Sequence, residues 1–389
     1  MIVAVGFIDP GNWAANLAAG SQFGYKLLWV ITLSTLILAF LQHNAAHLGI
    51  VTGKCLSENA TIHLNKILSR VILSTAMLAA VSTALAEILG AALALQMLFK
   101  LPLQIGAVIS GALVIWLLFS NSYRKIEKFI MGFVSLIGIS FLVELFIAPV
   151  DWGRASVSMF VPDMPSGSVL VIMSILGAVV MPHNLFLHSE VIQSRQWNLE
   201  DEDVIKKQLK YEFTDTIFSL TVGWIVNTAI VIIAAALFFS KGTVVTEIDQ
   251  AQNMLKPLLG NAAAVLFALA LLLAGIASSL TAGMAGGSIF AGIFNEPYDI
   301  RDSHSKIGVL ATMGIGVIAI FLISSPFKAL IYSQTLLSVQ LPITIFFQIY
   351  LTSSKKVMGK HKNTKLTNII LVLIGIFVTA LNIVLLFSL

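Results

Sequence analysis

The sequence contains very little charge. Only 11% of its 389 residues are Asp, Glu, Lys or Arg, against roughly 25% in an ordinary soluble domain, whereas 58% are hydrophobic. So few polar side chains cannot cover a soluble enzyme of this length, and the mean hydropathy of +0.94 indicates a polytopic helical membrane protein. The net charge of +4 is small, and the basic residues form no patch with interleaved aromatic side chains, which excludes a nucleic-acid-binding protein.

Cysteine is almost absent as well. The single residue Cys55 excludes an intrachain disulfide and a cysteine-based zinc or iron–sulfur site. No cleavable signal peptide is apparent, because the chain opens in apolar sequence that continues past a helix-breaking motif, so this segment is expected to belong to the mature fold. The abrupt start leaves open whether a soluble segment precedes residue 1. No feature indicates a bound cofactor or a required protein partner.

Long apolar runs divide the chain into predicted membrane spans, since about 20 mainly apolar residues cross a bilayer core. Eleven spans are expected, near residues 2–20, 26–46, 70–98, 103–120, 129–149, 168–189, 215–240, 261–285, 306–325, 328–351 and 367–388. The connections are too short to hold an extramembrane domain. The longest polar stretch, about 190–213, is expected to be a solvated cytoplasmic loop or a short helix.

The lysine and arginine residues predict the orientation of the chain. If the N-terminus is cytoplasmic, the inner connections hold 17 of the 23 basic residues and the outer connections hold 6. This bias predicts a cytoplasmic N-terminus, an extracytoplasmic C-terminus and an odd number of spans. The short connections favour a multi-pass protein of a prokaryotic inner (cell) membrane.

Two predicted spans carry helix-breaking motifs near their middle: Asp-Pro-Gly-Asn at residues 9–12 and Met-Pro-His-Asn at residues 181–184. Proline removes a backbone donor, so each helix should unwind, and unwound backbone at membrane depth is tolerated only where it faces protein or a water-filled cavity. A structural proline kink would explain either break alone. Together, the breaks begin two possible five-span units of opposite orientation, which predicts an inverted repeat with a substrate site between the broken helices. The predicted units are residues 1–150 and 166–352, with 366–389 as an added helix.

The side chains at the breaks indicate the kind of substrate. Asp9 offers a carboxylate, Asn12 a carbonyl oxygen and Met181 a thioether, and unwound backbone would add the carbonyls of Gly6 and Ala178. A soft sulfur gains little from Mg²⁺ or Ca²⁺ but binds softer divalent transition ions. A lone methionine is more often a packing residue, but this one adjoins the break.

These residues resemble the Nramp family of proton-coupled divalent metal transporters, and the resemblance covers essentially the whole chain. Beyond the two motifs, it rests on Ala19-Gly20-Ser21, Phe23-Gly24-Tyr25, residues 48–53, Leu85-Ala86-Glu87, Ser333-Gln334 and Leu341-Pro342. The resemblance implies a LeuT-type fold in which the metal ligands are Asp9, Asn12, Met181 and the Ala178 carbonyl. It also implies import of Mn²⁺ and Fe²⁺, with Co²⁺ and Cd²⁺ also carried, by alternating access coupled to proton entry. Gln334 is a further candidate to reach the ion when the site is occluded.

Three ionisable residues fit a proton pathway. His183 and Glu87 match positions that the family associates with the proton route, and His188 lies five residues further toward the cytoplasmic end. Histidine titrates near physiological pH, and a buried carboxylate is costly unless it is paired or protonated. Asp9 is a further proton acceptor, because metal binding and protonation compete at one carboxylate. A structural pair between Glu87 and His183 is the alternative.

The sequence also departs from the family pattern. The aspartate that many members carry three residues before the span-3 glutamate is Ala84 here, and a common span-8 glutamine is Gly287. An arginine pair expected around span 9 is represented only by Arg301 and Lys306. The usual proton exit is therefore in question, while the metal ligands are present.

Other interpretations remain open. A LeuT-type symporter of a small organic solute is disfavoured by the Asp9 carboxylate, and a Mg²⁺ carrier by Met181. An intramembrane hydrolase built on Asp9 and Glu87 lacks any recognisable hydrolase motif, and a sensor would need a signalling domain. His43 and His47 have a spacing that can bind metal but no apparent third ligand, and Glu144 is expected to be paired rather than to act in transport.

Overall fold

The computed structural model describes residues 9–120, 123–193 and 201–388. These residues form helices and contain no β-strand. The main helices are α2 (Pro10–Phe23), α3 (Leu28–Thr52), α4 (Leu56–His63), α5 (Lys66–Phe99), α6 (Leu103–Phe119), α7 (Tyr123–Ile147), α8 (Trp152–Ser158), α9 (Val169–Val179), α10 (Pro182–Ile192), α11 (Glu202–Leu237), α12 (Gln252–Leu259), α13 (Ala263–Ile293), α14 (Ser303–Ile320), α15 (Pro326–Ser353), α16 (Lys355–Met358) and α17 (Lys365–Ser388). The predicted all-helical fold is confirmed.

The predicted spans can be compared with helices long enough to cross a bilayer. Within the described residues, eight helical segments are long and apolar enough to do so, and α9 with α10 makes up one of them. The other three predicted spans correspond to α2, to the 17-residue α6, and to α7 with its apolar part Ser135–Ile147. Every predicted span therefore overlaps a helix, while the total of eleven crossings stays a prediction.

One boundary was wrong by more than three turns. The seventh span, expected at 215–240, begins at Glu202 and runs as one helix to Leu237. Asp201 caps this helix by accepting hydrogen bonds from the backbone N–H groups of Asp203 and Val204. Hydropathy marks only the part of a helix that lies in apolar surroundings, so the polar first turns fall in the stretch 190–213 that was expected to be a solvated loop or a short helix.

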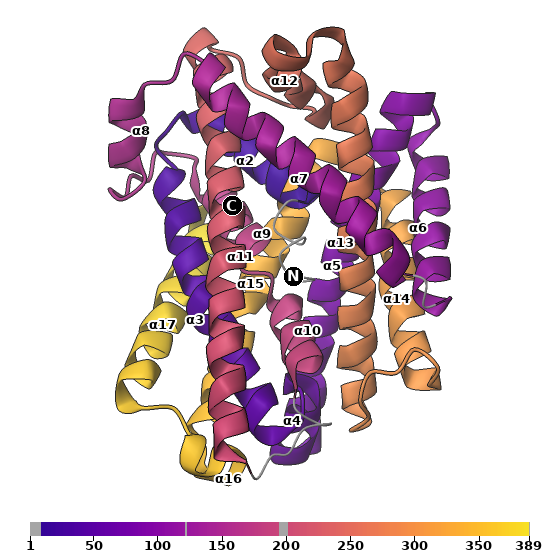
Figure 1. Cartoon of the computed structure of the whole chain (residues 1–389), viewed down its shortest axis with the longest axis vertical. Helices are drawn as coiled ribbons and strands as arrows, with labels where there is room; N and C mark the ends of the chain where they lie inside the picture. Colours follow the sequence, from indigo (N-terminus) through magenta and orange to yellow (C-terminus); the bar gives the residue numbers. More distant parts are fainter. Residues whose placement is uncertain (1–8, 121–122, 194–200, 389) are drawn as a thin grey trace.

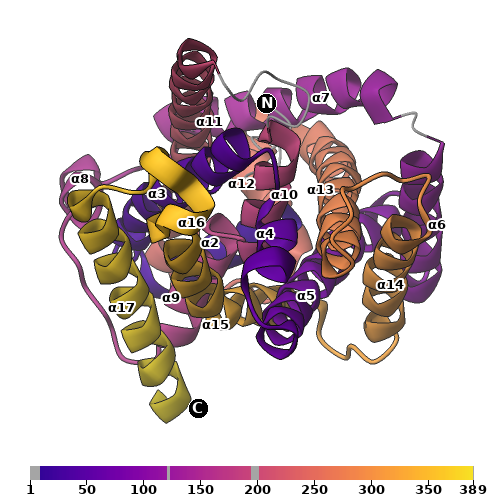
Figure 2. The same ribbon diagram turned by 90° about the horizontal axis from the view of Figure 1, so that it is seen from below.

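The long helices run along the long axis of the molecule, with α8 and α12 near one end and α4 and α16 near the other (Figure 1). Seen from below, α10 lies inside the bundle, where it packs on α3, α5 and α13 (Figure 2).

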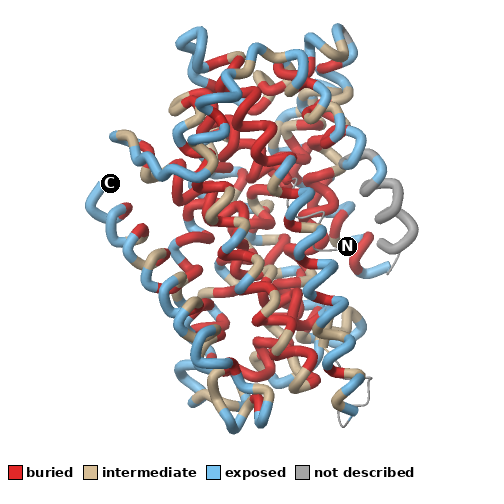
Figure 3. Tube along the Cα trace, turned by 60° about the vertical axis from the view of Figure 1, so that its left-hand side comes forward, coloured by how far each residue is buried: buried red, intermediate tan, exposed pale blue. Residues whose placement is uncertain are grey.

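Burial is concentrated along the axis of the bundle, and the outward faces of the surrounding helices are exposed (Figure 3). These faces carry large apolar side chains such as Phe146, Leu322 and Phe387, each more than four-fifths exposed. Water would disfavour such a surface, but hydrocarbon accepts it. The pattern matches a protein whose periphery meets lipid and whose polar groups lie inside.

Candidate metal site between two broken helices

The first motif is the start of a helix. Asp9 has an extended backbone (φ −115°, ψ 164°) and caps α2, and Pro10 occupies the first helical position, where its missing N–H costs nothing. The backbone N–H of Asn12 donates to Asp9 Oδ1 at 2.6 Å. Helix α2 therefore begins inside the predicted motif, at a place where Asp9 is fully buried, while the part of the first span before the motif lies outside the described residues. The Gly6 carbonyl, a candidate ligand, lies outside the described residues.

The second motif separates α9 from α10. Helix α9 ends at Val179, and Val180 and Met181 both have non-helical dihedral angles before α10 begins at Pro182. This confirms the predicted interruption of the sixth span. The carbonyls at the end of α9 are left without helical partners, as expected of a C-terminus.

The two half-helices begin with the same local arrangement. In each, the capping residue is followed by proline, and the asparagine at the third helical position bonds back to the capping side chain. Asn12 Nδ2 donates to Asp9 Oδ2 at 2.8 Å, and Asn184 Nδ2 donates to the Met181 sulfur at 3.1 Å. Each break thus holds its ligand-type side chain, a carboxylate or a thioether, at the N-terminus of a half-helix.

Asn12 joins the two breaks. Besides its bond to Asp9, Asn12 Nδ2 donates to the backbone carbonyl of Ala178 at 3.0 Å, across 166 residues of sequence. Three of the predicted ligands, Asp9, Asn12 and Ala178, therefore lie in one hydrogen-bonded group. Asp9 and Asn12 are at most 1% exposed, so access for an ion requires the helices around them to move.

Two buried polar groups at this place have unused hydrogen-bonding capacity. Asn12 Oδ1 and both amide atoms of Gln334 lack a hydrogen-bond partner among the described residues. Gln334 packs directly on α2, since a Cβ added to Gly11 would lie 2.0 Å from Gln334 Nε2. Buried polar atoms normally have partners, so Asn12 Oδ1 and Gln334 Oε1 are candidate ligand atoms.

Met181 is buried beside the α9–α10 break. Its side chain packs with Ala79 of α5 and Leu337 of α15. Met181 lies three residues along the chain from Ala178, on the other side of the α9–α10 break.

The candidate proton residues Glu87, His183 and His188 do not form one hydrogen-bonded group. Glu87 is fully buried on α5, and neither carboxylate oxygen has a hydrogen-bond partner within the described parts of the chain. His183 Nδ1 lies 3.3 Å from Thr83 Oγ1, one turn before Glu87. The direct Glu87–His183 pair considered from the sequence is therefore not formed here, although both residues lie where α5 and α10 meet.

His188 belongs to a different group of residues. Five positions along a helix turn the side chain by about 140°, so His188 faces away from His183. Its Nε2 lies 3.3 Å from Glu212 Oε1 of α11, and the other carboxylate oxygen lies 2.6 Å from His43 Nδ1 of α3. Glu212 was not among the predicted site residues, because the stretch 190–213 was expected to be a solvated loop or a short helix. His43 was given little weight, because no third ligand was apparent.

The departure at Ala84 has a structural counterpart. Ala84 is fully buried, and a Cβ added to Gly316 of α14 would lie 3.3 Å from its backbone and side chain. Small residues thus bring α5 and α14 into close contact where many family members are expected to have a carboxylate.

Buried polar side chains beside an interrupted membrane helix are typical of a LeuT-type membrane protein. The fold is shared with the transporter Mhp1 of the nucleobase-cation-symport-1 family, at a TM-score of 0.66 and 18% identity over 97% of this chain and 89% of that one. The chain belongs to the Nramp family: the profile described as natural resistance-associated macrophage protein-like matches residues 1–388. The predicted family resemblance is confirmed.

Individual relatives agree with this assignment. A protein of Caldanaerobacter subterraneus named divalent metal cation transporter MntH is 37% identical over 98% of this chain and 90% of its own length. A Dictyostelium discoideum protein named natural resistance-associated macrophage protein 2 homolog is 36% identical over the whole of this chain and 62% of its own length. The solved structure of an Eremococcus coleocola manganese transporter matches at a TM-score of 0.81 and 27% identity, over 98% of this chain and 84% of that one.

Proposed function

We propose that the protein imports divalent transition-metal ions, above all Mn²⁺ and Fe²⁺, by alternating access at the site between α2 and the α9–α10 break. The observation that carries this proposal is the convergence of Asp9, Asn12 and the Ala178 carbonyl. Support comes from relatives named as divalent metal cation and manganese transporters.

The ligand set suits transport rather than permanent storage. Asp9 supplies one negative charge, while Asn12, Ala178 and Met181 supply neutral donors, so an ion keeps part of its charge uncompensated and can leave. In the present arrangement Asn12 Nδ2 bridges Asp9 and Ala178. Rotation of this amide would direct Asn12 Oδ1 toward an ion and free the carboxylate and the carbonyl to bind it, and Gln334 would complete the set from α15.

Helices α9 and α10 are expected to move separately during the cycle, because the non-helical residues Val180 and Met181 act as a hinge between them. The common N-cap, proline and asparagine arrangement of the two half-helices supports the proposed repeat of residues 1–150 and 166–352, with 366–389 added. The distribution of basic residues supports a cytoplasmic end that carries α4 and α16.

Proton coupling is the second part of the proposal. Ala84 and its contact with Gly316 leave no ionisable group for the usual exit, so a proton is expected to use other groups. Glu87, His183 and Asp9 lie around the metal site. The His188–Glu212–His43 group continues toward the end that carries α4, where the His43 side chain is 37% exposed. Metal entry and proton entry would then take different inner paths.

The test of metal binding uses Asp9→Asn. Asparagine keeps the helix cap but removes the charge, so Mn²⁺ binding measured by calorimetry and Mn²⁺ flux into proteoliposomes should both be lost. The control is Glu144→Gln on α7, which removes another buried carboxylate that is not a proposed ligand and should leave binding intact. Unchanged Mn²⁺ affinity in Asp9→Asn would place the substrate site elsewhere.

Met181→Ala tests the selectivity. Loss of the thioether should weaken discrimination against Ca²⁺ and Mg²⁺, while part of the Mn²⁺ transport remains. The measurement is competition of Ca²⁺ with Mn²⁺ flux, with an internal pH dye recording proton entry in the same vesicles. A variant that still rejects Ca²⁺ as strongly as the wild type would refute the argument from sulfur softness.

A further inference from the structure

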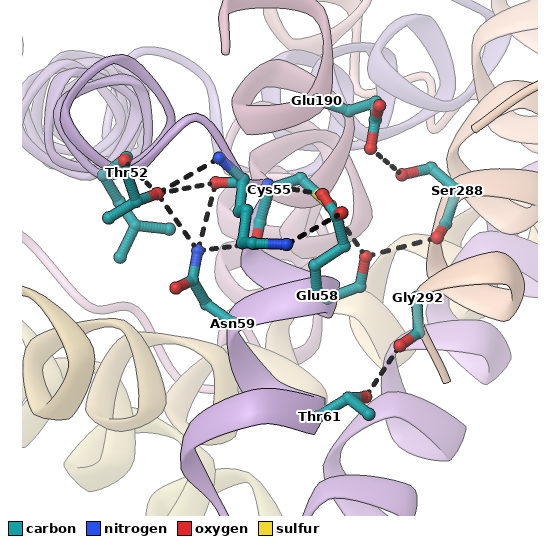
Figure 4. Close-up of polar contacts among 11 residues, drawn as sticks. Thr52, Cys55, Glu58, Asn59, Thr61, Glu190, Ser288 and Gly292 are labelled. Carbon is teal, nitrogen blue, oxygen red and sulfur yellow. Dashed lines mark hydrogen bonds and ion pairs between the residues drawn. The ribbon is translucent and has the colours of Figure 1, made fainter. Parts of the chain in front are cut away.

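A second group of metal-ligand side chains lies outside the transport site. Cys55 and Glu58 come from the start of α4, and Glu190 comes from α10 (Figure 4). The thiol sulfur and one oxygen of each carboxylate all lie within 4.8 Å of one another. The three residues are 0%, 1% and 8% exposed, so this is a buried cluster and not a patch of surface charge.

Neighbouring polar groups hold these three side chains in place. The backbone N–H of Cys55 donates to Glu58 Oε2 at 3.0 Å, and Ser288 Oγ of α13 donates to Glu190 Oε2 at 3.2 Å. The Ser57 hydroxyl lies 3.0 Å from the Cys55 sulfur and donates to the Ser288 carbonyl at 3.2 Å. Residues separated by more than 130 positions are thus positioned around one point, as the partners of metal ligands commonly are.

The donor set matches one class of ligand. A thiolate with two carboxylates suits a borderline or soft divalent ion such as Zn²⁺, Co²⁺ or Cd²⁺ rather than Mg²⁺. Metal–ligand bonds of about 2.0–2.3 Å in a tetrahedral site place the ligand atoms about 3.4–3.8 Å apart. The three ligand atoms, all within 4.8 Å of one another, are therefore close to the spacing that a bound ion requires. Binding would release the thiol proton to solvent.

We propose that Cys55, Glu58 and Glu190 form a second divalent transition-metal site, separate from the transport site between the broken helices. Met181 of the proposed transport site caps the start of helix α10, which carries Glu190 near its other end. An ion in the second site therefore ties this half-helix to α4 and holds it in place. The site lies at the end of the molecule that carries α4, which is the proposed cytoplasmic end.

The sequence argued against a cysteine-based site because only one cysteine is present. That argument holds for sites built from several thiolates. It does not apply to a mixed site such as this one, in which Glu190 comes from α10 and the sequence gives no reason to place it beside Cys55 and Glu58.

Cobalt titration tests the proposal, because Cys55 is the only thiol in the chain. Purified protein with Asp9→Asn and Met181→Ala, which lacks the charge and the sulfur of the transport site, should bind one equivalent of Co²⁺. Binding should produce a thiolate-to-cobalt charge-transfer band, and no other residue of this protein can give that band. Absence of the band, in this background and in the wild-type protein, would overturn the proposal.

Single variants then assign the ligands. Cys55→Ser should abolish the band, Glu190→Gln should weaken Co²⁺ binding strongly, and Ser288→Ala should weaken it by about tenfold through loss of a positioning bond. Glu202→Gln, a matched change at a surface carboxylate near the same end, should have no effect. Equal effects of Glu202→Gln and Glu190→Gln, or none from Glu190→Gln, would contradict the assignment. If Cys55→Ser prevents folding, the Glu190→Gln and Glu202→Gln pair decides the matter.

The outcome is independent of the transport function. A protein that fails to carry Mn²⁺ but shows the cobalt band would support the second site and refute the proposed function. A protein that carries Mn²⁺ but shows no cobalt band would support the proposed function and refute the second site.

Discussion

Replacing Gly177 with alanine should separate α9 from α15 and disable the transport site. Gly177 precedes Ala178, whose carbonyl joins the site, and it packs on the backbone of α15. A Cβ at this position would lie 1.8 Å from the backbone oxygen of Gln334 and 2.9 Å from the backbone nitrogen of Ser338. Neither atom is part of a flexible side chain, so rotation cannot relieve the clash.

The size of the effect follows from these distances. A carbon–oxygen contact of about 3.3 Å is the closest that is tolerated without strain, so the two helices must separate by about 1.5 Å. Overpacking of this kind costs about 1–3 kcal/mol. A displacement of about 1 Å at a reacting or binding group can lower a rate by about a hundredfold. Gly177→Ala should therefore lower the melting temperature in detergent by a few degrees and nearly abolish Mn²⁺ flux.

The matched control is Gly314→Ala on α14. A Cβ there meets no atom within 4 Å, so alanine should be neutral or should stabilise the helix by up to about 1 kcal/mol. Two results would refute the reasoning: Gly177→Ala protein that melts and transports like the wild type, or Gly314→Ala protein that is impaired to the same degree.

Three further predictions concern charged groups. Glu212→Ala removes the acceptor shared by His43, His188 and Thr216, so the free energy of unfolding should fall by about 1–3 kcal/mol. Thermal unfolding measures this, and an unchanged midpoint would show that these hydrogen bonds do not stabilise the protein. Glu87→Gln keeps the shape of a buried side chain and removes its charge, so Mn²⁺ uptake should persist while the accompanying proton entry decreases. An internal pH dye measures proton entry, and undiminished entry would exclude Glu87 from the proton route. Hydrogen bonds from Arg301 lower the pKa of Asp299 to about 2, against about 3.9 in an unfolded chain, so the stabilising effect of this carboxylate is present above about pH 4 and is lost as the pH falls toward 2. Asp299→Asn should therefore leave the pH profile of transport unchanged from about pH 5 to 8, and a shifted profile in vesicles would contradict this.

The class of the protein and its broken helices could be predicted because both depend on local sequence. Low charge and long apolar runs require a bilayer, and Pro10 and Pro182 each occupy the first position of a helix, as proline favours. Proline alone does not interrupt a helix, since Pro342 lies inside the continuous α15, so the surrounding motif was needed for the prediction. The side chains at those breaks, Asp9, Asn12 and Met181, could be named for the same reason. Helix boundaries outside the apolar region could not, as the early start of α11 shows.

What the sequence by itself determined is therefore the membrane setting, the two interruptions and the chemistry offered at each. The tertiary structure decided which distant groups meet. It joined Asn12 to Ala178, placed Gln334 against Gly11, gathered His43 and His188 on Glu212, and brought Glu190 beside Cys55 and Glu58. These contacts depend on how whole helices pack against one another. The period of a helix determines which residues lie on the same face, but it does not determine which neighbouring helix that face will contact.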